Sequence, residues 1–179
     1  MRKVIELTIA GVKCELELCK VSDKLDIAAF ILFDSVDVTV AAGKQLLERV
    51  PDFDVILTPE AKSIPLAYEM ARVSGKPYVV IRKGTKVYMT NPVCVDVRSI
   101  TTDRVQKLYL GETDVERLKG KRILVVDDVI STGETLLAIE QLVDQIGGEV
   151  VANCAVLAEG DAAERDDIIF LEKLPLFFK

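Results

Sequence analysis

The sequence of 179 residues contains no histidine. Without an imidazole, neither a Ser–His nor a Cys–His nucleophile pair can form, and no histidine can act as a general acid or base. Any chemistry must therefore use carboxylates, amines, guanidinium groups, hydroxyls, amides and backbone dipoles.

Cysteine is scarce as well. The four cysteines are Cys14, Cys19, Cys94 and Cys154. They form no Cys-x-x-Cys pair and have no histidine partners, which argues against a zinc site and against a disulfide framework. We interpret them as small hydrophobic side chains of a protein in a reducing cytoplasm.

Long apolar runs and an excess of positive charge are also missing. Half of the residues are hydrophobic, yet no apolar run approaches the ~18 residues of a membrane span. The first residues, Met1-Arg2-Lys3, lack the apolar segment of a signal peptide. The net charge of −6 argues against a nucleic-acid surface. We therefore expect a cytoplasmic protein without membrane or nucleic-acid partners.

Strand and helix patterns alternate along most of the chain. Apolar spacing predicts four strands separated by helices, over residues 55–58, 78–81, 123–126 and 150–158. Before them it predicts an N-terminal hairpin over 4–18 and a helix over about 37–50. It also predicts a second hairpin, in which 93–97 pairs with 106–110. This alternation predicts an α/β fold with a parallel twisted sheet flanked by helices. Such a sheet binds ligands outside the carboxyl ends of its strands.

Residues 123–135 form the most informative segment. An apolar run over 123–126 reads as a buried strand that ends on two adjacent carboxylates, Asp127 and Asp128. The turn after them and the first helical turn contain Ser131, Thr132, Gly133, Glu134 and Thr135. Backbone N–H groups and the helix dipole at such a turn can hold a phosphate. Two carboxylates can accept hydrogen bonds from vicinal hydroxyls, and the turn beside them can hold a phosphate. A sugar phosphate carries both of these groups.

This segment resembles the signature of the type I phosphoribosyltransferases, which bind 5-phosphoribosyl 1-diphosphate (PRPP). The resemblance implies that Asp127 and Asp128 contact the ribose hydroxyls and that the loop 131–135 wraps the 5′-phosphate. It implies one domain over 1–179, with a small N-terminal hairpin and hood over 1–36 and a PRPP-binding core over 52–160. We also expect Mg²⁺ held through PRPP and waters, and a homodimer.

Other readings of the acid pair fit less well. A response-regulator receiver domain also carries two acids after a strand, but only 51 residues follow Asp128, which is too few for the rest of that domain. The Gly-rich loop ending in Gly-Lys-Ser/Thr of nucleoside triphosphatases does not occur. An ordinary strand and turn with solvated acids is the remaining structural alternative.

Two further loops can bind anions. The turn over 59–63 carries Ala61 and Lys62 and resembles the diphosphate loop of the adenine-type members, which implies a strained Ala61–Lys62 peptide bond. The second loop follows the strand over 78–81 and contains three cations: Arg82, Lys83 and Lys86. Such a cluster at a strand end is an expected anion clamp in an acidic chain.

The second hairpin resembles the mobile hood that closes over the substrates of the family. Gln106 stands where adenine-type enzymes usually carry a glutamate, so the usual acid–base group is missing there. We expect Val129 to form one wall of the base site, Phe30 or Phe33 the other, and the residues from Leu157 to Glu159 the rim. Glu134 is expected to point outward from the first helical turn.

The resulting hypothesis is a purine phosphoribosyltransferase of purine salvage, with adenine as the favoured base. A transferase for another purine such as xanthine or guanine remains an alternative. So does a PRPP-sensing module without turnover, because the chain is also similar to the ligand domain of the purine operon repressor.

Overall fold

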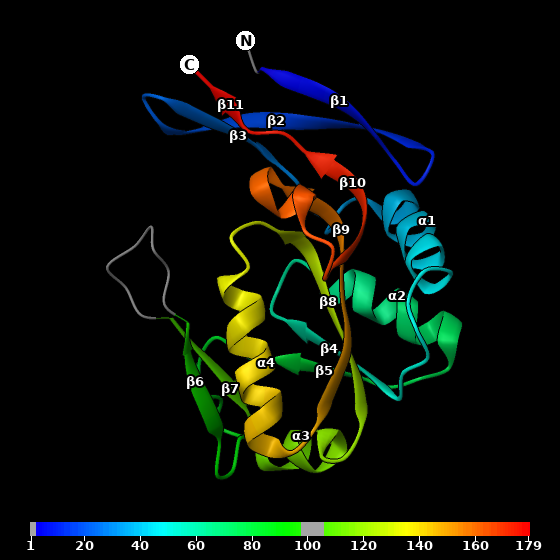
Figure 1. Cartoon of the computed structure of the whole chain (residues 1–179), viewed down its shortest axis with the longest axis vertical. Coiled ribbons are helices and arrows are strands. Elements are labelled where there is room, and N and C mark those ends of the chain that lie inside the picture. The colour runs from blue at the N-terminus through cyan, green and yellow to red at the C-terminus, as the bar shows by residue number, and fades with distance from the viewer. Residues whose placement is uncertain (1–2, 98–105) are drawn as a thin grey trace.

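The centre of the molecule is a five-stranded parallel sheet (Figure 1). The computed structural model describes residues 3–97 and 106–179. The sheet has the order β10-β9-β8-β4-β5. Its strands are β4 (Val55–Pro59), β5 (Tyr78–Ile81), β8 (Arg122–Ile130), β9 (Glu149–Glu159) and β10 (Ile169–Leu174). The predicted α/β fold is therefore confirmed.

Helices cover both faces of this sheet. They are α1 (Val36–Leu47), α2 (Ile64–Ser74), α3 (Glu112–Leu118) and α4 (Glu134–Ile146), with a short 3-10 helix η1 (Gly160–Glu164). One hydrophobic cluster joins α4 to one face, and a second joins α1, α2 and the N-terminal strands to the other. Because both faces are covered, β4 and the first part of β8 read as continuous apolar runs. None of the helices in the described residues is long and apolar enough to cross a membrane.

Glycines end two of the helices that flank the sheet. Gly75 after α2 and Gly147 after α4 have φ angles of 70° and 73°. This left-handed conformation has little steric penalty for glycine and satisfies the last helical carbonyls. It explains why the apolar periodicity in the sequence stops at these two positions.

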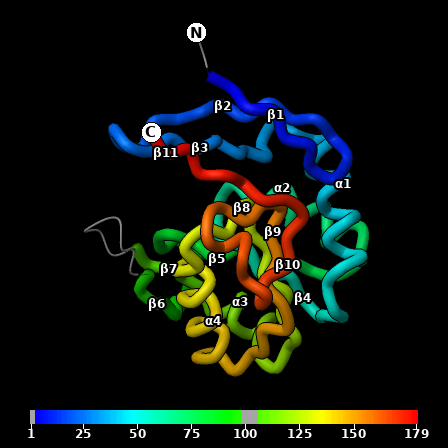
Figure 2. Tube along the Cα trace, turned by 45° about the horizontal axis from the view of Figure 1, so that its top comes forward, coloured from blue at the N-terminus to red at the C-terminus, as the bar shows by residue number. Residues whose placement is uncertain are grey.

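A smaller sheet lies over the carboxyl ends of the central strands (Figures 1 and 2). It has the order β1-β2-β3-β11, formed by β1 (Val4–Ile9), β2 (Val12–Ser22), β3 (Leu25–Ala29) and β11 (Phe177–Phe178). The sequence predicted only the hairpin of β1 and β2. It missed β3 and both C-terminal strands, β10 and β11, because their pairing depends on contacts between distant parts of the chain.

The second hairpin stands beside α4 (Figure 1). β6 (Val93–Val97) and β7 (Gln106–Leu110) pair antiparallel from Val93 opposite Leu110 to Val97 opposite Gln106. The two strands agree with the prediction. Residues 98–105, which join them, lie outside the described residues, so closure of this hairpin over a ligand stays a prediction.

The ladder between β8 and β9 contains one irregularity. Ile123 pairs with Val150, whereas Leu124 pairs with Ala152, so Val151 is an extra residue in β9. This β-bulge sets the register of everything that follows in the two strands.

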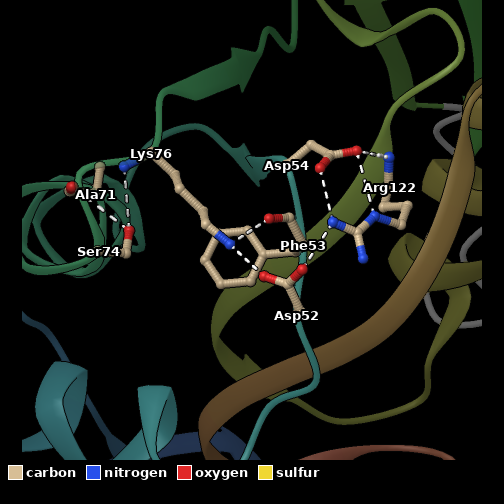
Figure 3. Close-up of polar contacts among 7 residues, drawn as sticks. All are labelled: Asp52, Phe53, Asp54, Ala71, Ser74, Lys76 and Arg122. Carbon is tan, nitrogen blue, oxygen red and sulfur yellow. Dashed lines mark hydrogen bonds and ion pairs between the residues drawn. The ribbon is translucent and has the colours of Figure 1, made fainter.

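A network of charged side chains ties the strand ends together at the opposite edge of the sheet (Figure 3). Arg122 at the start of β8 lies 2.9 Å from Asp54 and 2.7 Å from Asp52, measured between Nη2 and carboxylate oxygens. Lys76 Nζ lies 2.6 Å from the other oxygen of Asp52 and 4.3 Å from the ring centre of Phe53. Hydrogen bonds from Lys76 and Arg122 lower the pKa of Asp52 to about 2. The network therefore joins β4, β8 and the end of α2.

Candidate active site

The two carboxylates lie within a strand, not after it. The sequence predicted that the strand would end at Val126, which is wrong: β8 continues to Ile130, and Asp127 pairs with Ala155 in the β8–β9 ladder. Neighbouring side chains of a strand point to opposite faces. Asp127 and Asp128 therefore project to different sides of the sheet and meet different surroundings.

Asp128 is held by a lysine from the neighbouring loop. Its side chain is buried, and its Oδ2 lies 2.7 Å from Lys62 Nζ. Lys62 belongs to the turn between β4 and α2 and is about half exposed. This ion pair brings the predicted diphosphate loop against the predicted ribose-binding acids.

Among residues 3–97 and 106–179, no cation forms an ion pair with Asp127 as Lys62 does with Asp128. The Oδ1 of Asp127 accepts a hydrogen bond of 2.8 Å from the backbone N–H of Asp128. Burial, and next the negative charge of Asp128, raise the pKa of Asp127 well above its usual value, against a smaller lowering effect of Lys62. Burial also raises the pKa of Glu159 at the end of β9, where Lys62 acts in the opposite direction. The site therefore gathers acidic groups around one lysine.

The predicted phosphate loop joins β8 to α4. Gly133 has a φ of 81°, and α4 begins at the next residue. A cavity of about 50 Å³ lies beneath the loop, and Asp127 and Gly133 are among its lining residues. The hydroxyl residues Ser131, Thr132 and Thr135 also line it. The N-terminus of a helix of this length adds partial positive charge next to the cavity.

Glu134 lies on another side of the helix. It is half-buried and lines a groove between α4 and β6, together with Cys94 and Asp96. It does not line the cavity beneath the phosphate loop. This placement is compatible with the expected outward direction.

The turn between β4 and α2 is fastened to β8. Thr58 Oγ1 lies 2.8 Å from the carbonyl oxygen of Val126 and 2.8 Å from Ser63 Oγ. Ser63 in turn donates to the carbonyl of Pro59 at 2.9 Å. These buried hydroxyls hold the turn so that Ala61 and Lys62 are exposed at the carboxyl edge of the sheet.

The unusual peptide bond of this turn lies one residue earlier than predicted. The bond between Glu60 and Ala61 is cis, whereas the sequence analysis placed the distorted bond between Ala61 and Lys62. The loop type was anticipated from the resemblance, but the position of its unusual bond was wrong.

Glu60 connects the two predicted cationic loops, which sequence reasoning missed. Its Oε2 lies 3.2 Å from Arg82 Nε, and its Oε1 accepts a hydrogen bond of 2.6 Å from the backbone N–H of Lys83. Arg82 is thus placed beside the β4–α2 turn. Lys83 is exposed and Lys86 is half-buried in the turn that follows. An acid inside the first of these loops, two residues before Lys62, was the available sequence signal.

The residues predicted to form the base site are spread between surface and core. Val129 is half-buried on β8 and pairs with Leu157 in the β8–β9 ladder. Phe30 is 4% exposed and Leu157 is fully buried, and both pack in the cluster beneath the N-terminal sheet. Their side chains are therefore occupied by core packing, whereas Phe33 is 61% exposed.

Gln106 stands apart from the acid pair. It is exposed at the first position of β7, opposite Val97 in the hairpin ladder. Within the described residues, no contact joins Gln106 to Asp127 or Asp128. The structure thus brings Lys62, the acids and the phosphate loop together but leaves Gln106 on the separate hairpin.

The phosphoribosyl transferase domain matches residues 40–174, which is most of the chain. The chain belongs to the phosphoribosyl transferase domain family.

Curated relatives of this chain include adenine and hypoxanthine/guanine phosphoribosyltransferases. An adenine phosphoribosyltransferase of Thermotoga petrophila is 40% identical over 102 residues, covering 56% of each protein. A hypoxanthine/guanine phosphoribosyltransferase of Methanococcus voltae is 34% identical over 135 residues, covering 75% of this chain and 68% of the relative. The chain thus spans between about half and two thirds of the length of these phosphoribosyl transferase relatives.

Solved structures share the fold of the family. The adenine phosphoribosyltransferase of Thermoanaerobacter pseudethanolicus superposes with a TM-score of 0.68 at 20% identity, covering 96% of this chain and 95% of that one. The enzyme of Giardia lamblia, solved with 9-deazaadenine, gives a TM-score of 0.67 at 16% identity, covering 95% and 93%. At such identities the likeness concerns the fold alone.

Proposed function

We propose that the protein transfers the 5-phosphoribosyl group of PRPP to a purine base, with adenine as the favoured base, and releases diphosphate in purine salvage. The observation that carries the proposal is the 2.7 Å contact between Lys62 and Asp128. It joins a ribose-binding acid to a diphosphate loop, and the phosphate loop follows on the same strand. One ligand with a phosphate, a ribose and a diphosphate matches this order.

Each loop has a role in holding PRPP. The loop 131–135 takes the 5′-phosphate, and Asp127 and Asp128 accept hydrogen bonds from the ribose hydroxyls. The diphosphate lies against Ala61, Lys62, Arg82, Lys83 and Lys86. A diphosphate carries more negative charge than the carboxylates of Asp128 and Glu60, so it competes for the two cations that these acids hold.

Mg²⁺ fits this site as a companion of PRPP. Among the described residues, no group of three or more acidic or sulfur side chains could hold a metal ion. Mg²⁺ usually keeps several waters and binds one or two carboxylates together with phosphate oxygens. Asp127 and Asp128 suit contacts to it through waters, and the ion supplies neutralisation of the diphosphate charge.

The chemistry follows from charge and position. The bond between C1′ and the diphosphate oxygen breaks as the base nitrogen forms a bond to C1′; the electron pair leaves with the diphosphate, and the base loses its N–H proton to the departing diphosphate or to water. Cations of the diphosphate loops stabilise the charge that develops on the departing group, and the base wall at Val129 positions the nucleophile over C1′. Gln106 can donate a hydrogen bond to a purine nitrogen but cannot deliver a proton. We therefore expect turnover that is slower than with a carboxylic acid at this position.

The proposed setting is a homodimer in the cytoplasm. Val36 and Val40 lie on one face of α1 and are exposed, as are Ile31 and Phe33 just before it. Exposed apolar side chains on a helix and just before it favour a protein partner. A second copy of this chain is the partner that we propose, and the cytoplasm suits the four free cysteines.

A PRPP sensor is the second candidate. A purine biosynthesis transcriptional repressor, PurR of Bacillus subtilis, is 30% identical over 113 residues, which cover 63% of this chain and 39% of the repressor. The amide at Gln106 in place of an acid also favours this candidate.

One assay separates these functions. The protein is incubated with PRPP, Mg²⁺ and adenine, hypoxanthine, guanine or xanthine, and nucleotide formation is followed. Faster formation of AMP than of any other nucleotide supports the proposal. If another base reacts fastest, that base takes the place of adenine in the proposed function. PRPP binding by calorimetry without any nucleotide product identifies a sensor.

A further inference from the structure

The phosphate loop carries no positive charge of its own. Residues 130–135 contain neither lysine nor arginine, and the one charged residue among them is Glu134. A phosphate monoester carries between one and two negative charges at neutral pH. Backbone N–H groups and a helix dipole contribute only partial charges. A nearby cation would add a full charge to the cradle.

Arg165 places its guanidinium group directly against this loop. It follows η1, which continues from the carboxyl end of β9, next to the end of β8 (Figure 2). A Cβ atom built on Gly133 would lie 2.2 Å from Arg165 Nη1 and 3.4 Å from its Cζ. The arginine therefore occupies the space that a side chain at Gly133 would need.

One half of this guanidinium is already held by a carboxylate. Arg165 Nε and Nη2 donate to the two oxygens of Asp167 at 2.8 and 2.6 Å. This fork lowers the pKa of Asp167 and raises that of Arg165. In the described part of the chain, Nη1 donates no hydrogen bond, and this is the nitrogen next to Gly133. Arg165 thus presents Nη1 to the loop while Asp167 holds its Nε and Nη2.

We propose that Arg165 is a binding residue for the phosphate monoester in the loop 131–135, and that Asp167 is its positioning residue. This inference rests on the proposed function, which places the 5′-phosphate in this loop. Nη1 donates to the phosphate while the fork with Asp167 stays in place. Charge-assisted bonds of this type are shorter and stronger than neutral ones, and the planar arginine loses little freedom when it is already fixed.

The inference is tested by titrating the full chain with ribose 5-phosphate and, separately, with Mg²⁺–diphosphate, using calorimetry. Arg165→Met should weaken the binding of ribose 5-phosphate by about 10- to 100-fold, the size of one lost charge-assisted bond. The affinity for diphosphate should stay the same, because Lys62 and Arg82 bind that group. Arg165→Lys should recover part of the loss.

Asp167→Asn tests the positioning role. It should weaken ribose 5-phosphate binding less than Arg165→Met does, because the cation remains but is no longer fixed. Both variants should also flatten the rise in affinity between about pH 5 and pH 7, where the phosphate gains its second charge. A purely structural role would not change this pH profile. Arg117→Met, a surface arginine beside Asp114, is the matched control and should change neither affinity.

The outcomes separate the inference from the function on which it rests. A wild-type protein that binds neither PRPP nor ribose 5-phosphate overturns the proposed function. Tight binding by the wild type with unchanged affinity and pH profile in Arg165→Met overturns the role of Arg165 alone. If Arg165→Met fails to fold, unchanged ribose 5-phosphate binding by Arg165→Lys and Asp167→Asn has the same meaning.

Discussion

At the residue scale, two adjacent acids have different surroundings. Asp128 is compensated by Lys62 at 2.7 Å, whereas burial and the charge of its neighbour raise the pKa of Asp127. Alternation along β8 causes this difference, because it turns the two side chains to opposite faces. Two identical neighbouring residues thus have different charge environments.

The pH dependence of stability should report the state of Asp127. Its pKa is higher in the folded than in the unfolded chain, so the unfolded chain ionises first as pH rises from about 4. The free energy of unfolding therefore falls between that pH and the raised folded pKa. Asp127→Asn should remove this fall, as measured by urea unfolding across the pH range. Equal slopes in the variant and the wild type would contradict the assignment.

Removal of Lys62 should affect both folding and ligand binding. Lys62→Met leaves the buried carboxylate of Asp128 without its cation, so the loss of unfolding free energy should exceed the ~1 kcal/mol of an exposed ion pair. Binding of Mg²⁺–diphosphate should lose roughly 1.5–3 kcal/mol. Calorimetry and urea unfolding measure the two effects. Lys20→Met is the control, because Lys20 pairs with Asp23 on the surface of the N-terminal sheet.

We expect Gln106 to limit the rate of the proposed reaction. Gln106→Glu supplies the missing proton-transfer group and should raise turnover with adenine, by a factor approaching ~10². Steady-state rates of AMP formation measure this. A wild-type chain that turns over briskly with another base, and is slowed by Gln106→Glu, would argue against adenine.

At the element scale, the charged network at the amino ends of β4 and β8 lies at the edge opposite the site (Figure 3). Its charged members are exposed or half-buried, so each ion pair contributes little by itself. Their shared geometry fixes where β4 begins relative to β8. The turn after β4 and the acids on β8 depend on this alignment.

The contribution of this network to stability should appear in the pH dependence of unfolding at acidic pH. The lowered pKa of Asp52, about 2, means that its contribution is complete above pH ~4 and is lost as the pH falls towards 2. Arg122→Met removes two of the ion pairs and should flatten the pH dependence of unfolding in that window. Thermal melting at several pH values is the measurement. Arg117→Met, whose pair with Asp114 spans 4.0 Å, should leave the profile unchanged.

The sequence predicted the central elements better than the peripheral ones. β5 and the two strands of the second hairpin have the predicted bounds, because short apolar runs between turn residues mark them clearly. The strand predicted over 123–126 was shorter than β8, because two carboxylates interrupt the apolar run. Glu60 and Arg165 were missed because their contacts join loops that are distant in sequence.

At the scale of the whole molecule, two sheets share one hydrophobic cluster. Ile9, Leu16 and Phe30 from the N-terminal strands pack with Ile56 and Leu124 of the central sheet. The N-terminal sheet is therefore packed on the carboxyl edge rather than tethered to it. Ligand binding between the two sheets should stabilise both together.

PRPP should raise the melting temperature of the whole chain in one transition. Saturation at about 100 times the dissociation constant adds about 2.7 kcal/mol to the free energy of unfolding. For a chain of this size, that corresponds to a shift of roughly 5–10 °C. Thermal unfolding with Mg²⁺, with and without PRPP, measures it. Absence of any shift would contradict PRPP binding.

Assembly should depend on the apolar face of α1. Val40→Asp places a charge in the proposed dimer contact and should convert the protein to a monomer, as measured by light scattering after gel filtration. Val87→Asp is the control, because Val87 is fully exposed on a turn outside that face. A wild-type monomer would contradict the proposed homodimer.

The bulge at Val151 has a consequence for the evolution of the chain length. The bulge accommodates one extra residue of β9. It lies in the ladder before the pair of Asp127 and Ala155, and this pair stays in register. Loss of that single residue could convert the bulge into a regular ladder without turning any later side chain. A deletion farther along β9 would instead invert every following residue, including those that lead to Arg165. Natural variants of this chain should therefore tolerate a change of length at the bulge. They should show none in the part of β9 that follows the bulge.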